Sequence, residues 1–361
     1  MSNEHLYALV MAGGGGTRLW PLSRHTHPKQ MLQLFGDRTM FQLSVDRLLP
    51  LLPVEHVLVV TAAEQVDGLA AQYPSLPREN FIVEPMGRGT ASCIGLAALH
   101  LRRRDPEAVM VVVTADHFIQ KEEAFRETLL AAQEIAGQGH LVTLGITPTE
   151  PSTGYGYICR GADLGVAHGL PYFRVKHFTE KPDLAAAQRF LQEGTYSWNS
   201  GMFIWRVDRI LEEIQRWMPA LCDTLLTLDA VLDTPAYMET LQRHWPSVHK
   251  ETIDYGIMER ADRVAVIPVD LGWSDIGAWP AVMALHTTDA HNNVVVGDVI
   301  PLDTFDTMIF AHGDRLVATI GINDLIIVDT PDALLIARPD QAQRVRDIVD
   351  QLKAGGREDK L

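Results

Sequence analysis

The sequence predicts an α/β fold, in which a mostly parallel sheet carries helices on both faces and is followed by a small all-β unit. In the first half of the chain, short β-branched, apolar runs alternate with longer amphipathic segments. These runs are apolar on both faces, as expected of parallel strands that are covered on both sides. From residue 292 to residue 337, only short strand-like pieces recur, about every 8–10 residues, with Asp, Gly or Asn between them.

The alternation places the elements as follows. Strands are expected at residues 7–12, 56–61, 80–85 and 108–116, and helices at 40–49, 63–72 and 90–104. Further on, strands are expected near 173–180 and 202–207, and helices near 183–192 and 207–217. The final strand-like pieces are 293–300, 307–312, 315–321, 324–330 and 333–337, closed by a helix at 341–352. This spacing suits a short β-solenoid, although it is irregular. We expect a catalytic domain at 1–286 and a β unit at 287–361.

Composition excludes several classes of protein. The 361 residues carry a formal net charge of −15, which argues against nucleic-acid and anionic-membrane binding, since both require a basic face. A few local cations would still suffice for a small polyanionic substrate. The three cysteines, Cys93, Cys159 and Cys222, fit neither a disulfide framework nor a metal cluster. The N-terminus resembles no signal peptide, and no apolar run could span a bilayer, so we expect a cytoplasmic protein.

A run of four glycines, Gly13–Gly16, directly follows the first expected strand. Glycines there let backbone N–H groups approach phosphate oxygens. The run has no Gly-Lys-Ser/Thr ending and fails the dinucleotide-binding pattern at Arg18, so neither a P-loop nor a Rossmann dehydrogenase fits. A plain flexible turn is the alternative. Arg18 and Lys29 favour an anion site, because they add two cations to one loop.

Asp116 ends the fourth expected strand, at the sheet edge where ligands of such folds bind. A carboxylate there suits Mg²⁺, which prefers oxygen ligands. The commoner role of a lone Asp at this position is to cap the following helix. Asp275 in "WSDIGAW" is equally ambiguous by itself.

The sequence resembles the sugar-1-phosphate nucleotidylyltransferases, and among them the mannose-1-phosphate guanylyltransferase branch. The resemblance rests on "GGGGTRLWPLSR…PKQ", "EPMGRGTA", "TADH", "STGYGYI", "FTEKP", "WNSGMF", "IDYGIME", "WSDIGAW" and "LIIVDTPDALLIA", which cover almost the whole chain in order. It implies a Rossmann-like, GT-A-like nucleotidyltransferase domain and a short left-handed β-helix-like unit. The isomerase-type cupin domain of longer members is absent from these residues.

The resemblance implies that the protein transfers GMP from GTP to mannose 1-phosphate and releases pyrophosphate, with Mg²⁺ as cofactor. It implies a homodimer, and the acidic net charge argues against a nucleic-acid or membrane partner. The implied catalytic residues are Arg18 and Lys29. Asp116 and Asp275 are the implied metal ligands. The nucleotide would contact Gly13, Gly14, Gly15, Gly16, Thr17, Glu84, Gly87, Arg88 and Thr90. The sugar phosphate would contact Gly154, Tyr155, Glu180, Lys181, Asn199 and Asp254.

Three departures from the family pattern and two rival functions bear on this interpretation. Gly89, Ser92 and Gly15 stand where relatives often have Asn, Pro and Ser. A glucose-1-phosphate enzyme that uses UTP or dTTP is the rival within the class. An inactive regulatory subunit on the same fold is the rival outside it, although such proteins typically lose one of the residues Arg18, Lys29, Asp116 or Asp275. We expect Lys29→Ala to reduce turnover about a hundredfold with an unchanged melting temperature.

Overall fold

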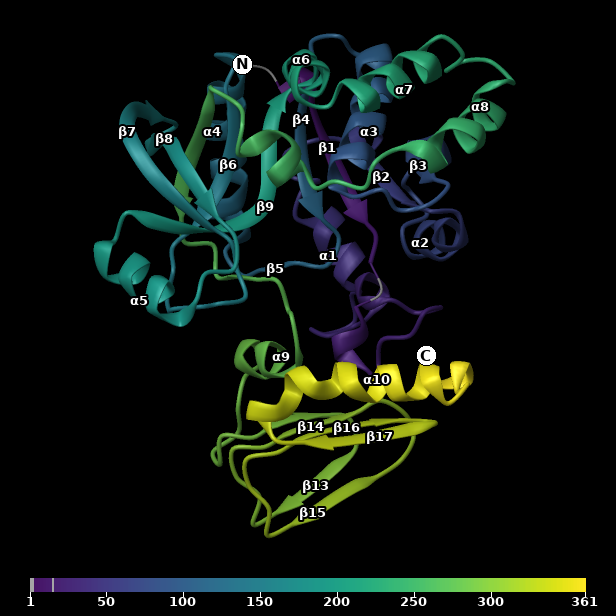
Figure 1. Ribbon diagram of the computed structural model, residues 1–361. Helices are drawn as coiled ribbons and strands as arrows, with labels where there is room; N and C mark the ends of the chain where they lie inside the picture. The colour runs from purple at the N-terminus through teal and green to yellow at the C-terminus, as the bar shows by residue number, and fades with distance from the viewer. Residues whose placement is uncertain (1–2, 15) are drawn as a thin grey trace. The chain divides into compact units, whose positions relative to one another are not determined.

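The computed structural model describes residues 3–14 and 16–361, which form two compact units (Figure 1). The first unit comprises residues 3–13, Ser44–Ala115 and Ile119–Trp273. The second comprises Gly14–Leu43, Asp116–Phe118 and Ser274–Leu361. Each unit is therefore built from segments that are far apart in the sequence.

The first unit is organised around a nine-stranded sheet of order β3-β2-β1-β4-β9-β6-β10-β8-β7. The strands are β1 (Leu6–Ala12), β2 (Val57–Ala62), β3 (Phe81–Glu84), β4 (Val109–Thr114), β6 (Leu141–Ile146), β7 (Tyr157–Ala167), β8 (Leu170–Thr179), β9 (Tyr196–Arg206) and β10 (Val264–Val269). The four strands expected from the first half are confirmed as β1 to β4, and they run parallel. β9 lies antiparallel between β4 and β6, whereas β6 and β10 are parallel.

Helices cover both faces of this sheet, as expected. On one face, α3 (Thr90–Arg104), α6 (Val207–Trp217), α7 (Pro219–Asp229) and α8 (Tyr237–His244) share a core with Tyr7 and Leu9 of β1. On the other face, α4 (Glu122–Gly137) packs on the central strands. The first unit also contains α2 (Val66–Gln72), α5 (Leu184–Glu193) and a π-helical turn, η8 (Asp254–Met258); α1 (Met40–Asp46) crosses from the second unit into the first. Its short 3-10 turns are η1 (Asn3–His5), η4 (Val54–His56), η5 (Ala63–Gln65), η6 (Arg78–Asn80) and η7 (Trp245–Ser247).

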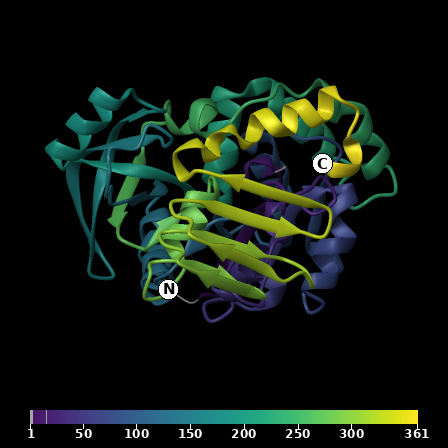
Figure 2. The ribbon, with the colours of Figure 1, turned by 90° about the horizontal axis from the view of Figure 1, so that it is seen from below.

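The second unit contains the C-terminal β unit, which is β-helix-like as expected. Its strands are β12 (Val294–Val296), β13 (Val299–Leu302), β14 (Met308–Ala311), β15 (Val317–Ile320), β16 (Ile326–Thr330) and β17 (Ala333–Ala337). Two sheets form, β12-β14-β16-β17 and β13-β15, and successive coils pair in parallel until β17 turns back. Figures 1 and 2 show α10 (Val345–Ala354) lying along the larger sheet. The expected strand at 293–300 is two strands, because the chain bends at Gly297, where φ is 92° and a Cβ would lie 2.2 Å from the Ala311 carbonyl.

The core of the second unit joins the β unit to an N-terminal segment. Leu19, Leu32 and Leu34 pack in one cluster with Met308 and Phe310. The same segment holds the 3-10 turns η2 (Thr17–Leu19) and η3 (Lys29–Met31), and the unit is completed by α9 (Trp279–Leu285), η9 (Pro339–Arg344) and η10 (Glu358–Lys360). The short strands β5 (Phe118–Ile119) and β11 (Trp273–Ser274) lie where the chain passes between the units. The expected boundary at residue 286 divides the chain into two continuous stretches, whereas each compact unit combines several separate stretches.

Candidate active site

Lys29 is the centre of a polar group within the second unit. Its side chain is only 7% exposed. The ammonium Nζ donates to Asp116 Oδ2 at 2.9 Å and also to the backbone carbonyl of Asp275. The structure thus brings together three residues that lie far apart in the sequence and that were predicted as one catalytic lysine and two metal ligands.

The electrostatics of Asp116 follow from this contact. Burial by itself would raise the pKa of the Asp116 carboxyl, but the Lys29 ammonium and its hydrogen bond lower it below its usual value. The carboxylate is therefore ionised at neutral pH while it remains 32% exposed. The Lys29 ammonium thus pairs with the Asp116 carboxylate and also donates to the Asp275 backbone carbonyl.

The glycine run leads into this group. Gly14 and Gly16 have φ values of 115° and 53°, which non-glycine residues rarely adopt. A Cβ at Gly16 would lie 2.4 Å from Lys29 Cβ, so the loop packs directly on the lysine. The Ser23 hydroxyl fixes the loop by donating to the Gly16 carbonyl at 2.8 Å. Arg18 and Thr17 follow in η2, and Gly15 lies outside the described residues.

In the first unit, Glu84 ends β3 and begins a second loop. Burial raises the pKa of its carboxyl to about 7, although the Arg88 N–H and the Trp245 side chain oppose the shift. The backbone N–H of Arg88 lies 3.4 Å from Glu84 Oε1. A Cβ at Gly87 would meet no atom within 4 Å, so the loop leaves open space there. A half-buried carboxylate beside open space can accept hydrogen bonds from a ligand.

The rest of that loop is anchored to another segment of the first unit. The Arg88 guanidinium donates to the Pro246 carbonyl, and Thr90 Oγ1 accepts from the Ile253 N–H at 2.8 Å. Gly89 has φ 88°, and a Cβ there would lie 2.2 Å from the Glu251 carbonyl. This close approach gives a physical reason for Gly89, one of the positions where the sequence departs from the expected pattern.

A third polar group lies elsewhere in the first unit. Asn199 Nδ2 donates to Asp254 Oδ1 at 2.7 Å, and its Oδ1 accepts from the Gly201 N–H. Burial raises the pKa of Asp254, the Asn199 hydrogen bond opposes this, and the Glu180 charge adds to it. Tyr155 packs against Trp198, with ring centroids 5.0 Å apart. The predicted sugar residues Tyr155, Asn199 and Asp254 therefore lie on one continuous framework.

Of the predicted pair Glu180 and Lys181, Glu180 lies close to this group, whereas Lys181 is mostly exposed. Glu180 lies against Gly156, where a Cβ would be 2.5 Å from Oε2. Lys181 pairs with Glu180 at 3.0 Å, and its side chain is 65% exposed. A Cβ at Gly154 would touch the Ser152 hydroxyl at 3.6 Å, an ordinary contact. Lys181 thus stays free to turn toward an anion at small cost.

The structure adds residues that the sequence reasoning missed. Trp245 is fully buried, and its indole donates to the Met86 carbonyl at 3.0 Å, which fixes the loop after Glu84. Trp273 packs on Tyr155, with centroids 5.3 Å apart. Glu251 contacts the same loop through its backbone N–H and carbonyl. The Glu251 contact leaves no trace in residue type because it is made by the backbone, and Trp245 lies in none of the sequence motifs.

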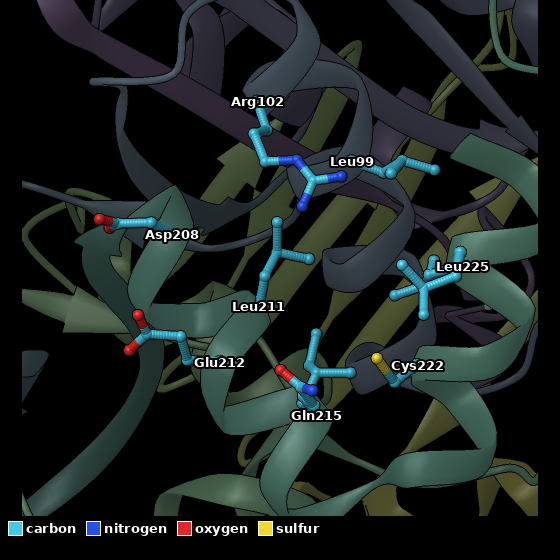
Figure 3. A pocket seen from close by; sticks show the side chains of 10 residues that line it. Leu99, Arg102, Asp208, Leu211, Glu212, Gln215, Cys222 and Leu225 are labelled. Carbon is cyan, nitrogen blue, oxygen red and sulfur yellow. The ribbon is translucent and has the colours of Figure 1, made fainter. Parts of the chain in front are cut away.

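A cavity of about 260 Å³ between α3, α6 and α7 contains none of the predicted residues (Figure 3). Leucine side chains line it, and the Arg102 guanidinium at its rim pairs with Asp229 at 2.8 Å. Burial raises the pKa of its thiol, Cys222. The predicted catalytic and binding residues therefore lie outside this cavity.

Two family models match most of the chain. The nucleotidyl transferase family model matches residues 7–292, and the mannose-phosphate isomerase/GMP-like β-helix domain model matches residues 297–352. A mannose-1-phosphate guanylyltransferase of Escherichia coli K12 is 41% identical over 362 residues, covering 99% of this chain and 75% of the relative. The alginate biosynthesis protein AlgA of Pseudomonas aeruginosa is 37% identical, covering 97% and 72%.

A solved structure from Thermus thermophilus, described as a mannose-1-phosphate geranyltransferase, superposes with a TM-score of 0.87. It is 36% identical, and the match covers 97% of this chain and 99% of that one. Among the described residues, no helix is long and apolar enough to cross a membrane.

Enzymes of this family generally use a divalent metal. The ionised and partly exposed Asp116 carboxylate is the kind of oxygen donor that such a metal binds. Divalent Mg²⁺ commonly takes one or two protein carboxylates and fills its remaining positions with water and substrate phosphates. The Asp116 and Asp275 side chains are the candidates.

Proposed function

The chain belongs to the nucleotidyl transferase family, among its mannose-1-phosphate guanylyltransferases, and we propose on that basis how its own residues synthesise GDP-mannose. The observation that carries the proposal is the group of Lys29, Asp116 and Asp275 beside the glycine loop. An oxygen of mannose 1-phosphate attacks the α-phosphorus of GTP, the bond to the β-phosphate oxygen breaks, and pyrophosphate leaves. Two polyanions must approach each other, so the protein chiefly supplies position and positive charge.

Lys29 neutralises charge at the α-phosphate, and Arg18 stabilises the departing pyrophosphate. Gly13–Gly16 and Thr17 present backbone N–H groups to the triphosphate. Asp116 and Asp275 would hold Mg²⁺, which supplies charge neutralisation at the phosphates. Two features support this assignment: Lys29 is buried and fixed by Gly16, and Asp116 is held ionised.

Glu84 selects guanine. A carboxylate can accept from both the N1–H and the exocyclic amine, a pair of donors that uracil and thymine lack. Open space beside Gly87 leaves room for a base, while Arg88 and Thr90 hold the loop. The burial of Glu84 supports the assignment, because hydrogen bonds to a desolvated carboxylate are among the stronger ones.

Asp254, Asn199 and Glu180 bind hydroxyls of the hexose, Tyr155 and Gly154 line its ring, and Lys181 meets its phosphate. The Asn199 amide nitrogen donates to Asp254 and its amide oxygen accepts from the Gly201 N–H. Asp254 and Glu180 therefore provide the acceptors for hydroxyl groups. This geometry supports a polyhydroxylated ligand, and choice between mannose and glucose depends on the direction of one hydroxyl.

We assign residues 1–286 to the catalytic domain and 287–361 to the β unit, and propose that the β unit forms a homodimer interface. Its exposed large apolar side chains are Val295, Ile300, Leu302, Phe305, Leu316, Ile320, Leu334 and Ile336. Such surfaces favour association with a second copy. The free thiols of Cys93, Cys159 and Cys222 support a reducing, cytoplasmic location.

The test is to incubate the protein with Mg²⁺ and each pairing of mannose or glucose 1-phosphate with GTP, UTP or dTTP, and to measure pyrophosphate. We expect mannose 1-phosphate with GTP to react fastest. Fastest release with glucose 1-phosphate and UTP or dTTP would establish the rival enzyme. No release with any pairing, while the nucleotide still binds, would establish an inactive regulatory subunit.

A further inference from the structure

Segment 245–254 holds the loop after Glu84 through side-chain and backbone contacts along its length. The Trp245 indole donates to the Met86 carbonyl, and the Arg88 guanidinium donates to the Pro246 carbonyl. The Glu251 N–H donates to the Arg88 carbonyl at 3.1 Å, and the Glu251 carbonyl accepts from the Ala91 N–H at 3.2 Å. These backbone bonds make a short ladder between two segments that are about 160 residues apart in the sequence.

The ladder ends at the first turn of α3. The Ile253 N–H donates to Thr90 Oγ1 at 2.8 Å. Thr90 is the first residue of α3, so this bond ties the helix start to the residue that precedes Asp254. The loop and segment 245–254 approach so closely at Gly89 that a Cβ there would lie 2.2 Å from the Glu251 carbonyl.

The other end of segment 245–254 belongs to the sugar group. Asp254 follows Ile253 and accepts from Asn199 at 2.7 Å. The Asn199 backbone N–H in turn donates to the Gly156 carbonyl at 2.7 Å, and Gly156 lies beside Glu180. A continuous line of contacts therefore runs from Glu84, through segment 245–254, to Asp254 and Glu180.

Asp254 begins a π-helical turn, η8, in which its neighbour Gly256 packs against Met218 and Glu251. Such turns are uncommon and often occur at functional sites. Moving Asp254 therefore requires moving the Glu251–Ile253 backbone, and moving that backbone breaks its bonds to Arg88, Ala91 and Thr90.

We propose that Thr90 and Glu251 are positioning residues that couple the two substrate subsites, so that a guanine nucleotide bound at the Glu84 loop raises the affinity for the sugar phosphate at Asp254. The inference rests on the proposed function, which places the nucleotide and the sugar at those two groups. A nucleotide that orders the Glu84 loop also fixes segment 245–254 and Asp254, and the sugar phosphate then binds to a site that is already ordered. Reciprocity requires the sugar phosphate to tighten nucleotide binding by the same factor.

The experiment is calorimetry on the full chain with Mg²⁺, mannose 1-phosphate and α,β-methylene GTP, whose methylene bridge prevents transfer. Each ligand is titrated alone and in the presence of the other. In the wild type we expect each ligand to tighten binding of the other by about fivefold or more, the usual lower range of such coupling.

Thr90→Val keeps the shape of the side chain but removes the acceptor for the Ile253 N–H, so the tightening should fall to within about twofold of none. Thr90→Ser retains a hydroxyl and should retain the coupling. Thr224→Val is the matched control, since the Thr224 hydroxyl donates only to its own helix, at the Ala220 carbonyl. A merely structural role of Thr90 would weaken each ligand alone without changing the ratio.

Hydrogen exchange on the wild type gives a measurement that needs no variant. With the nucleotide analogue alone, we expect slower exchange at the Glu251 and Ile253 amides and in the Asn199 strand, not only in the Glu84 loop. Protection confined to residues 84–90, or full coupling in Thr90→Val, would overturn the inference while leaving the proposed function intact. Failure of the wild type to bind either ligand would overturn both.

Discussion

Replacement of Lys29 by Ala tests the central group of the second unit, because the substitution removes the buried ammonium and both of its hydrogen bonds. The proposed reaction concentrates charge at the α-phosphate in its transition state, where a preorganised cation contributes most. Loss of one such stabilising group typically costs about 10²–10³ in kcat. We expect kcat/KM to fall by at least about a hundredfold.

The structure changes the expected effect on stability. Removing one partner of a charged hydrogen bond costs about 1.5–3 kcal/mol, and the 2.9 Å contact with Asp116 is of this kind. Since Asp116 remains 32% exposed, water can replace part of the lost contact, which favours the lower end. At about 2 °C per kcal/mol for a large domain, the lower end corresponds to a fall of about 3 °C in the melting temperature, which is then not unchanged.

The assays are steady-state pyrophosphate release and thermal unfolding. Lys121→Ala is the matched control, because Lys121 also pairs with an aspartate, Asp270, but at the surface, where such pairs contribute about 0–1 kcal/mol. It should leave turnover unchanged. Activity of Lys29→Ala within threefold of the wild type would remove Lys29 from the catalytic group.

Three further predictions follow from the other groups. Asp116→Asn and Asp275→Asn should each raise the Mg²⁺ concentration needed for half-maximal activity, and full wild-type activity in excess EDTA would refute both metal ligands. Glu84 has a pKa raised from 4.5 to about 7 by burial, so its protonation stabilises the folded protein at low pH and this contribution is lost as pH rises through about 7. Affinity for GTP should increase as pH rises through about 7, since guanine needs the ionised carboxylate. Glu84→Gln should flatten this pH dependence and reduce the preference for GTP over UTP by about 1–3 kcal/mol. An unchanged GTP/UTP ratio would place base selection elsewhere. Deletion from Asn292 onward should abolish activity as well as change the sedimentation coefficient, because it removes Met308 and Phe310 from the core that holds Leu32; an active, well-folded truncation would show the β unit to be dispensable.

The sequence predicted the elements whose patterns are local. The strands β1 to β4 and the helix α3 have continuous apolar runs or clear periodicity, and their bounds agree closely with the expected ones. It did not predict that β9 inserts antiparallel between β4 and β6, since strand order depends on contacts across the whole sheet. β7 and the first half of β8 alternate with exposed polar residues and gave no strong apolar signal.

In the candidate site too, local sequence patterns could place some residues and not others. Asp116 and Gly13 could be placed by their positions after neighbouring parallel strands, and pairing of Met11 with Thr114 bears this out. Asp275 could be joined to them only through the resemblance, because 158 residues separate it from Asp116. Glu251 acts through its backbone, so no residue-type pattern could reveal it.

The shared core of the second unit has a consequence for how such chains can be recombined. The indole of Trp20 donates to the Lys360 carbonyl at 2.8 Å, and the indole of Trp279 donates to the Trp20 carbonyl at 3.0 Å. The last residues of the described chain are thereby fastened to the segment that carries Arg18 and Lys29. A β unit grafted from a homologue would meet a foreign partner at these indoles. Chimaeras should therefore work only when residues 14–43 and 274–361 are exchanged together.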